Sequence, residues 1–227
     1  MSLCRYAIYF VPGGAVGAFG AKWLGWDVGA ATQPDRMVIE GLPRPREILT
    51  KAARKYGLHA TLKAPFALAE DRQEADLVSS FKSFCKAQKP VCAGQLKFSH
   101  GGGFLSLRPS PPLHGLNQLA QQCVISFDPF RKAATTKELE RRRKANLTPA
   151  QDHLLQRWGY PYVMDEFRFH ITLTGRVDDS EAEQITNALK PALDPLLSDP
   201  FIINELALAA ERADGQFCIL ERANLLA

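Results

Sequence analysis

The sequence lacks any apolar run long enough to span a membrane. Of its 227 residues 46% are apolar, yet no window approaches the ~18 consecutive apolar residues of a transmembrane helix. The opening stretch, "MSLCRYAIYFVPGG", holds only a short apolar run that includes Arg5, and no small-residue cleavage site follows a long apolar segment. We interpret it as a strand and not as a signal peptide. The expectation is a cytoplasmic protein without membrane contact.

The sequence also lacks cysteines and histidines at the spacing of a metal site. The five cysteines are odd in number and form no CxxC pair, so neither a disulfide framework nor a structural zinc site is expected. They are Cys4, Cys85, Cys92, Cys123 and Cys218. Three histidines likewise have no partner at metal-ligand spacing. They are His100, His114 and His153. The sequence therefore predicts no metal, no cofactor and no nucleophilic cysteine.

A strong charge of one sign is missing as well. The formal net charge is +4, and the sequence pI is about 8.8. This mildly basic balance is compatible with an anionic substrate but too weak to indicate broad coating of nucleic acid. The clearest local cluster, "RRRK" at 141–144, is interpreted as a solvated helix face.

Hydrophobic periodicity and the placement of glycine and proline predict alternating strands and helices. Strands are expected at 5–12, 58–66 and 166–177, and hairpins at 94–109 and 201–223. Helices are expected at 44–57, 70–88, 113–130, 135–146, 147–159 and 179–198, the last interrupted near Pro191. For the 147–159 helix, Thr148 is the expected cap and Pro149 the first helical residue. Residues 13–43 are rich in Gly and Pro, and only a short helix around "AFGAKWLGW" is expected there.

Two halves of the chain carry the same pattern. "HATL" begins at His59 and "HITL" at His170, an offset of 111 residues, and each is followed by a helix and a hairpin. Phe104 and Phe217 stand early in the second strand of each hairpin, at an offset of 113. A near-constant offset over this length favours duplication, so we expect one bilobal domain over 1–227 made of two pseudo-equivalent lobes.

Strand alternation places the polar side chains of each motif on one face. The expected faces are His59, Thr61 and Lys63 in the first copy, and Arg168, His170, Thr172 and Thr174 in the second. Two facing lobes would then enclose imidazoles, hydroxyls and cations without a carboxylate, a set suited to a phosphate diester. Imidazoles can exchange protons at neutral pH, and preorganised hydroxyls can stabilise charge on phosphoryl oxygens. A single HxT is weak evidence, but two copies at equivalent points favour function.

The motifs "HATL" and "HITL" resemble those of the 2H phosphoesterase superfamily, which includes cyclic nucleotide phosphodiesterases and RNA 2',5'-ligase-like proteins. The strings "RYAIYFVP", "HATLKAPF", "FDPFR" and "FRFHITLTG" are similar to one uncharacterised branch, often encoded beside carbon–phosphorus lyase genes for phosphonate use. The resemblance covers essentially the whole chain. It implies an α+β bilobal fold with two antiparallel sheets, outer helices and a central cleft. It also implies a site formed by His59, Thr61, His170 and Thr172.

From these patterns we predict a metal-independent phosphodiesterase that opens a cyclic or 2',5'-linked phosphate ester. His59 and His170 are the expected acid and base, in an order left open, and Thr61, Thr172, Lys63 and Arg168 the expected phosphate ligands. Cyclic nucleotides or ribose cyclic phosphates are the expected substrate class, and phosphonate metabolism is the expected context. A non-catalytic nucleotide or phosphonate sensor and an RNA 2',5'-ligase-like protein are the alternatives. Oligomeric state, and whether 13–43 form a lid, are left open.

Overall fold

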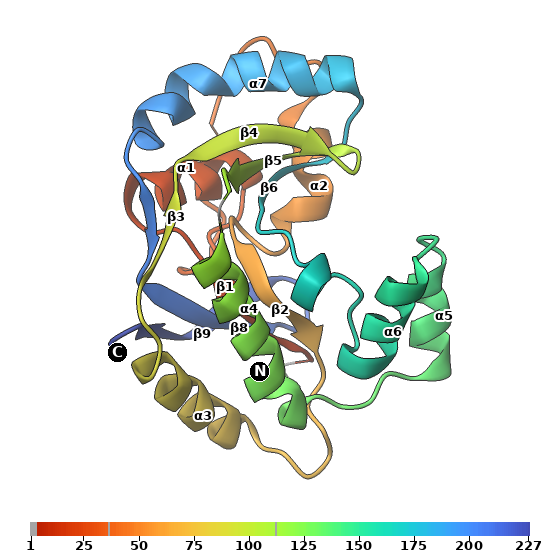
Figure 1. Ribbon diagram of the computed structural model, residues 1–227. Coiled ribbons are helices and arrows are strands. Elements are labelled where there is room, and N and C mark those ends of the chain that lie inside the picture. The colour runs from red at the N-terminus through yellow and green to blue at the C-terminus, as the bar shows by residue number, and fades with distance from the viewer. Residues whose placement is uncertain (1–3, 36, 112) are drawn as a thin grey trace.

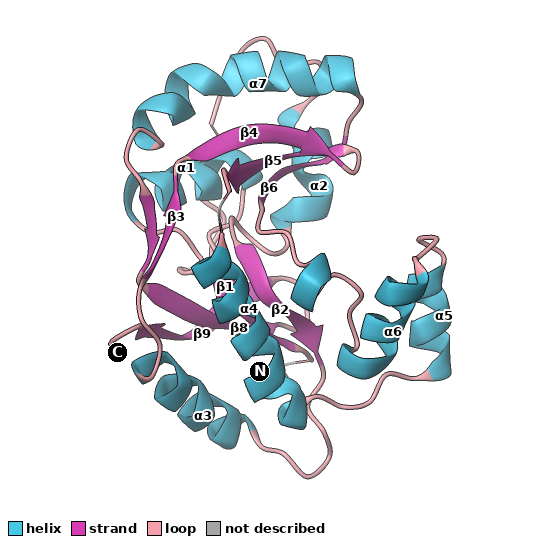
Figure 2. Ribbon diagram, in the orientation of Figure 1, coloured by secondary structure: helices cyan, strands magenta, loops and turns pink. Residues whose placement is uncertain are grey.

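Antiparallel sheets form the framework, and the larger ones combine strands from both halves of the chain (Figures 1 and 2). The computed structural model describes residues 4–35, 37–111 and 113–227. A four-stranded sheet has the order β2-β1-β8-β9, and a three-stranded sheet has the order β4-β5-β6. The strands of the first are β1 (Tyr6–Phe10), β2 (Ala60–Phe66), β8 (Glu205–Glu211) and β9 (Phe217–Asn224). Those of the second are β4 (Leu96–Gly101), β5 (Phe104–Pro109) and β6 (Ile171–Arg176).

The order of elements repeats along the chain, as the sequence pattern indicates. The first series runs β2, α3 (Glu74–Lys86), β3 (Val91–Gly94), β4 and β5, and the second runs β6, α7 (Asp179–Leu193), β7 (Phe201–Ile203), β8 and β9. The two series exchange their hairpins: β5 of the first pairs with β6, whereas β8 of the second pairs with β1 beside β2. A short antiparallel ladder between β3 and β7 joins the halves. This α+β architecture confirms the fold class expected from the sequence.

Helices cover the outer faces of the sheets. In Figure 1, α7 lies along the edge strand β4, and α3 lies beyond β9 at the opposite end of the molecule. Helix α4 (His114–Phe127) packs on β2, and α2 (Arg46–Arg54) packs on β6 beside α1 (Gly14–Leu24). Helices α5 (Thr136–Arg143) and α6 (Pro149–Trp158) form a hairpin that projects to one side. None of the helices in the described ranges is long and apolar enough to cross a membrane.

One apolar core passes between the sheets and locks the lobes together. It contains Trp23, Leu49, Phe81, Phe127 and Leu173, each 1% exposed or less. Burying a large apolar side chain stabilises the fold by roughly 1.5–3 kcal/mol. The indole Nε1 of Trp23 also donates to the carbonyl oxygen of Leu173 at 2.8 Å, which ties α1 to β6. The segment carrying the second motif is therefore held by both packing and hydrogen bonding.

The capping residues predicted from the sequence are better borne out than the predicted break inside a helix. Thr148 caps α6 through a capping box with Gln151, and Pro149 occupies the first turn, as predicted. The interruption predicted near Pro191 is wrong, because α7 continues through it to Leu193 before a 3-10 turn follows. The helix expected around 18–26 lies instead at Gly14–Leu24 and ends at Gly25, whose φ of 77° is a left-handed C-cap.

Candidate active site

The two histidine motifs meet in one pocket of about 540 Å³ between the sheets. His59 immediately precedes β2, and His170 immediately precedes β6. Both imidazoles line the pocket together with Thr61 and Thr172. The structure therefore brings His59 together with His170 and Thr61 together with Thr172, and the members of each pair are 111 positions apart in the sequence. A volume of this size suits a small organic ligand.

The two imidazoles are oriented by the same backbone contact. Nδ1 of His59 lies 3.0 Å from the carbonyl oxygen of Gly57, and Nδ1 of His170 lies 2.7 Å from the carbonyl oxygen of Arg168. In each case the acceptor belongs to the residue two positions earlier. Because a carbonyl oxygen can only accept, Nδ1 carries the proton, and Nε2 of the neutral ring is left with a lone pair. Nε2 of His59 lies 3.1 Å from Thr61 Oγ1, whose hydroxyl donates to it in this tautomer.

Each imidazole also packs against an aromatic ring. The ring of Tyr9, on β1, lies 4.0 Å from that of His59, centroid to centroid, and Phe104, at the start of β5, lies 5.5 Å from His170. The ring of Tyr56 also lies 5.6 Å from that of His59, centroid to centroid. These contacts limit rotation of the rings and remove water from their faces. Tyr9 itself is fully buried, although it lines the pocket.

Burial lowers the pKa of both histidines. Loss of hydration is the main cause at His59, where the pKa falls from 6.5 to about 4, and the nearby His170 lowers it further. The hydrogen bond to Gly57 acts in the opposite direction but is outweighed. At His170 burial again lowers the pKa, and Arg108 adds to the effect. A neutral His59 with a lone pair on Nε2 is therefore the expected form near pH 7.

The threonines of the second strand have different surroundings. Thr172 and Thr174 both line the pocket. Thr174 Oγ1 is already engaged, because it accepts from the backbone N–H of Leu105 and donates to the carbonyl oxygen of Gly175, each at 2.9 Å. Within the described residues Thr172 Oγ1 has no such partner, so its hydroxyl is available to a ligand. The alternation predicted for His170, Thr172 and Thr174 is correct.

The alternation predicted for Lys63 is wrong because of a β-bulge. Tyr9 pairs with Thr61, but the preceding residue Ile8 pairs with Lys63, so β2 holds one extra residue at this point. The bulge turns Lys63 away from the pocket and brings Ala64 and Pro65 to its wall. Lys63 is 3% exposed and donates to the carbonyl oxygen of Val124 at 3.0 Å, with Asp128 at 3.6 Å.

Arg168 does not line the pocket either. Burial alternates through Phe167, Phe169 and Ile171, so Arg168 is on the same side as His170, but its side chain is exposed and does not reach the pocket. Its Nη1 donates to the carbonyl oxygens of Asp165 and Phe167, at 2.6 and 2.7 Å, and the residue is exposed. Its backbone carbonyl, which orients His170, is the part that contacts the motif.

Several lining residues are not found by the motif analysis. Arg141 and Arg142 line the pocket, although α5 is a solvated helix without a buried residue, as the sequence indicated. They come from α5, which lies between the two motifs in the sequence, more than 70 positions after the first and 27 positions before His170. Tyr160 and Arg176 join them, and none of the described residues of 13–35 and 37–43 lines this pocket. Arg176 continues the alternation of His170, Thr172 and Thr174 along β6, whereas the contacts of Tyr160 and of the α5 arginines depend on tertiary packing.

The charge of the pocket is basic. Arg5, Arg141, Arg142 and Arg176 line it, and no aspartate or glutamate is among its lining residues. Arg5 is held by Glu211 through two contacts of 2.6 and 2.7 Å, so much of its charge is compensated. The described residues contain no cluster of three side chains suited to a metal ion. An anionic ligand is the one this lining favours.

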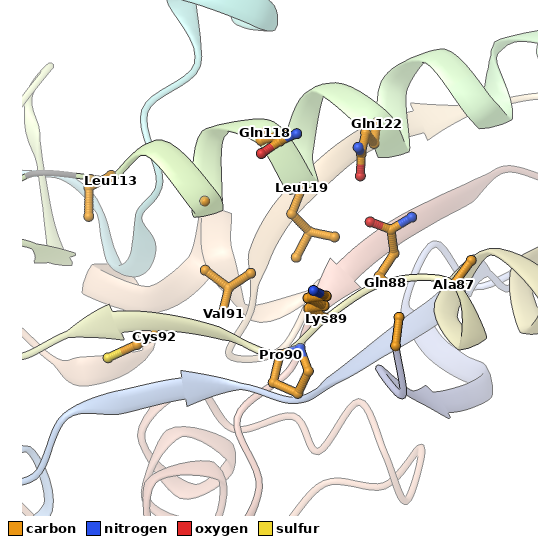
Figure 3. A pocket seen from close by; sticks show the side chains of 12 residues that line it. Ala87, Gln88, Lys89, Pro90, Val91, Cys92, Leu113, Gln118, Leu119 and Gln122 are labelled. Atoms are coloured by element: carbon orange, nitrogen blue, oxygen red, sulfur yellow. The ribbon is translucent and has the colours of Figure 1, made fainter.

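A second hollow lies away from the histidines, between α4 and the segment that leads from α3 into β3 (Figure 3). Its volume is about 460 Å³. Three amide side chains face it, those of Gln88, Gln118 and Gln122, beside Leu119 and Val91. It offers no pair of groups that could exchange protons near neutral pH. The chemistry therefore points to the pocket of the two motifs.

Comparison with known protein families gives one match over most of the chain. The family described as "Protein of unknown function (DUF1045)" matches residues 61–218. A protein of Janthinobacterium sp. (strain Marseille), named "Ribose 1,5-bisphosphate phosphokinase PhnN", is 38% identical over 94% of this chain and 49% of its own length. A protein of the same name from Laribacter hongkongensis (strain HLHK9) is 30% identical over 93% and 49%. The chain spans about half the length of the curated relatives it matches.

Solved structures show weaker similarity. One described as "Crystal structure of phosphoesterase" is 16% identical, with a TM-score of 0.43 and full coverage of both chains. E. coli LigT complexed with NADP+ and with 3'-AMP gives TM-scores of 0.44 at 15% and 16% identity, again over both full chains. Similarity at this level assigns no function.

Proposed function

The chain belongs to the DUF1045 family, and we propose that it hydrolyses a cyclic phosphate ester with His59 and His170 as its proton-transfer groups. The observation that carries the proposal is the matched pair of imidazoles. Both line one basic pocket, and both are held at Nδ1 by the carbonyl two residues earlier, which leaves Nε2 to act. Binding an anion requires only donors, whereas two imidazoles that each carry a lone pair on Nε2 also permit proton transfer at both ends of a reacting bond.

We assign His59 as the base, because burial lowers the pKa of both imidazoles but has the larger effect at His59. A general base must be neutral, and His59 is the group whose pKa falls to about 4. In the proposed step Nε2 of His59 takes a proton from a water molecule as its oxygen attacks phosphorus. The bond from phosphorus to one ester oxygen breaks, and that oxygen receives a proton from Nε2 of protonated His170. The negative charge of the bound diester favours this protonation. The products are a phosphate monoester and a free hydroxyl, so one water is consumed.

The threonines are proposed to hold the phosphoryl oxygens. Thr172 has a free hydroxyl, and Thr61 can turn its hydroxyl from His59 Nε2 to a ligand oxygen once a substrate enters. Donors fixed in this way stabilise the charge that gathers on the phosphoryl oxygens. Arg176, which lines the same pocket, is a better candidate for a charged ligand than Lys63 or Arg168. The scheme requires neither a metal ion nor a cofactor.

A cyclic ribose phosphate or a cyclic nucleotide is the proposed substrate class, within phosphonate metabolism. The relatives named PhnN support a phosphorylated sugar, because that name refers to ribose 1,5-bisphosphate. It also refers to a kinase, but those proteins are about twice as long as the matched region. This chain has no Gly-Lys dipeptide and so no phosphate-binding loop of the Gly-x4-Gly-Lys-Ser/Thr type. A kinase function of this region is therefore not proposed.

Phosphorus NMR of the purified protein with 2',3'-cyclic nucleotides and ribose 1,2-cyclic phosphate tests the proposal. Ring opening should occur with the wild type in the presence of EDTA and should be lost in His59→Ala and in His170→Ala. Undiminished activity in either variant would contradict the proposed pair. Thermal stabilisation by these compounds without any product would favour the sensor alternative instead. Joining of RNA ends by the same pair would favour the ligase-like alternative.

A further inference from the structure

The pocket continues from the histidines to a wall formed by the α5–α6 hairpin. Arg141 and Arg142 on α5, and Tyr160 just after α6, line it together with Tyr9 and Tyr56. In Figure 1 this hairpin projects beside the free end of β2 and belongs to neither sheet. The wall thus comes from elements that do not carry the histidine motifs.

Arg142 is held in place on this wall, but its charge is poorly compensated. Its Cζ lies 5.2 Å from the centroid of the Tyr160 ring, a cation–π contact. The nearest carboxylate is that of Glu138, at 3.6 Å from Arg142 and 4.0 Å from Arg141, so one carboxylate serves two guanidinium groups. The wall therefore keeps a net positive charge beside the pocket.

Two buried polar atoms at this end of the pocket have no hydrogen-bond partner among the described residues. They are Tyr9 Oη and Arg142 Nε. Tyr9 is fully buried, and burial raises its pKa, with smaller effects from Tyr56, Arg5, Glu211 and Tyr160. An unpaired buried donor costs roughly 1–3 kcal/mol. An anion between Tyr9 and Arg142 would supply acceptors for both.

Among the described residues, the contacts of Arg142 are with Tyr160 and Glu138 and not with either histidine, whereas Tyr9 packs against His59 and so borders both parts of the pocket. Arg142 acts instead on Tyr160, whose pKa it lowers against the larger effect of burial. A phosphate diester at the histidines would therefore leave Arg142 free for a different part of the substrate.

We propose that Arg142, Tyr160 and Tyr9 form a second subsite that binds a phosphate monoester group carried by the substrate, in addition to the diester at the histidines. This inference rests on the proposed function for the position of the diester. The substrate is then a doubly phosphorylated molecule, one phosphate being cleaved at an ester bond and the other serving as an anchor.

The test is a binding comparison that needs no turnover. Adenosine 2',5'-bisphosphate and adenosine 2'-monophosphate are titrated calorimetrically into the wild type. The bisphosphate should bind about tenfold more tightly or better, as a charge-assisted contact contributes about 1.5–3 kcal/mol. Arg142→Gln should remove this preference and leave binding of the monophosphate unchanged. Arg142→Lys, which keeps the charge, should retain part of it.

The matched control is Arg143→Gln, because Arg143 is the next residue of α5 but pairs with Asp152 at 2.6 Å and does not line the pocket. It should keep the full preference. Equal affinity of the wild type for both nucleotides, absence of binding of either, or equal losses for both in Arg142→Gln would overturn the subsite. If the preference holds while no cyclic ester is opened, the proposed function fails and the subsite stands. If cyclic esters are opened but the bisphosphate binds no more tightly than the monophosphate, the proposed function stands and the subsite fails.

Discussion

Tyr9 stacks its ring 4.0 Å from the imidazole of His59 while its own hydroxyl, buried in the wall of the same pocket, has no hydrogen-bond partner in the described structure. The aromatic ring and the hydroxyl therefore have separable effects. The ring orients and dehydrates His59, which lowers its pKa. The unpaired hydroxyl destabilises the unliganded protein, and a bound anion can supply the missing hydrogen-bond acceptor.

Replacing Tyr9 by Phe should accordingly stabilise the free protein and weaken ligand binding. Removal of the unpaired hydroxyl is expected to raise the free energy of unfolding by about 1 kcal/mol, measured by urea denaturation. Affinity for adenosine 2',5'-bisphosphate should fall, because one donor of the second subsite is lost. Tyr9→Ala serves as the contrast, since loss of the buried ring should destabilise by roughly 3–5 kcal/mol. A destabilised Tyr9→Phe would show that the hydroxyl has a partner.

The lowered pKa of His59 predicts a pH dependence of stability. The unfolded chain binds a proton near pH 6.5, whereas the folded protein does so only near pH 4. Between these values the unfolded state holds more protons, so the free energy of unfolding falls as the pH drops from 6.5 to 4. Each pKa unit corresponds to about 1.4 kcal/mol, which gives a loss of up to about 3 kcal/mol.

His59→Gln should lack this part of the loss, which denaturant titrations at pH 7, 5.5 and 4.5 can measure. The variant His100→Gln is a suitable control, because His100 lies outside the pocket and pairs with Asp179 at 2.7 Å. Identical pH slopes for His59→Gln and the wild type would refute the assigned pKa direction.

Gly57 is expected to be essential for the position of His59. Its φ is +68°, and a Cβ at this residue would lie 2.7 Å from Cβ of Val28. Gly57→Ala therefore combines backbone strain with a clash and should cost about 1–3 kcal/mol. Because the Gly57 carbonyl holds Nδ1 of His59, activity should fall more than stability alone explains. Gly215→Ala offers the comparison, with a φ of +80° and open space around its Cβ position. Equal activity losses in both variants would contradict the positioning role.

Lys63→Met tests the finding that a β-bulge places Lys63 outside the pocket. Lys63 is buried beside Asp128, and burial lowers its pKa to about 8. An apolar side chain of similar length keeps the packing, and Asp128 retains its contact with Arg131 at 2.8 Å. Ring-opening activity should therefore stay within about twofold of the wild type, and stability should change by less than about 1.5 kcal/mol. A loss of activity as large as that of His59→Ala would show that Lys63 contributes to the active site.

The helices, the hairpins and the candidate histidines could be predicted because they depend on local patterns. Thr148 and Pro149 define the start of α6 through their own backbone and side-chain contacts, and the repeated HxT pattern marks His59, Thr61, His170 and Thr172, which the fold then gathers in one pocket. The role of these residues stays a prediction. At Pro191 the local rule failed, because helix α7 buries Leu189 and Leu193 on either side of the proline, and this packing favours continuation.

The sequence by itself determined the α+β class, the repeated order of elements and the two motifs. Each of these depends on the spacing of residues within a short segment, or on the repetition of such a segment along the chain. Only the tertiary structure decided that the hairpins exchange between the halves, that a bulge turns Lys63 into the core, and that Arg142 and Tyr9 complete the pocket wall. The physical reason is that strand pairing and side-chain burial are settled between segments far apart in the chain. A β-bulge changes the face of the sheet on which a residue lies, although the residues next to it in the sequence stay the same. The α5 arginines line the pocket only because tertiary packing places α5 beside it.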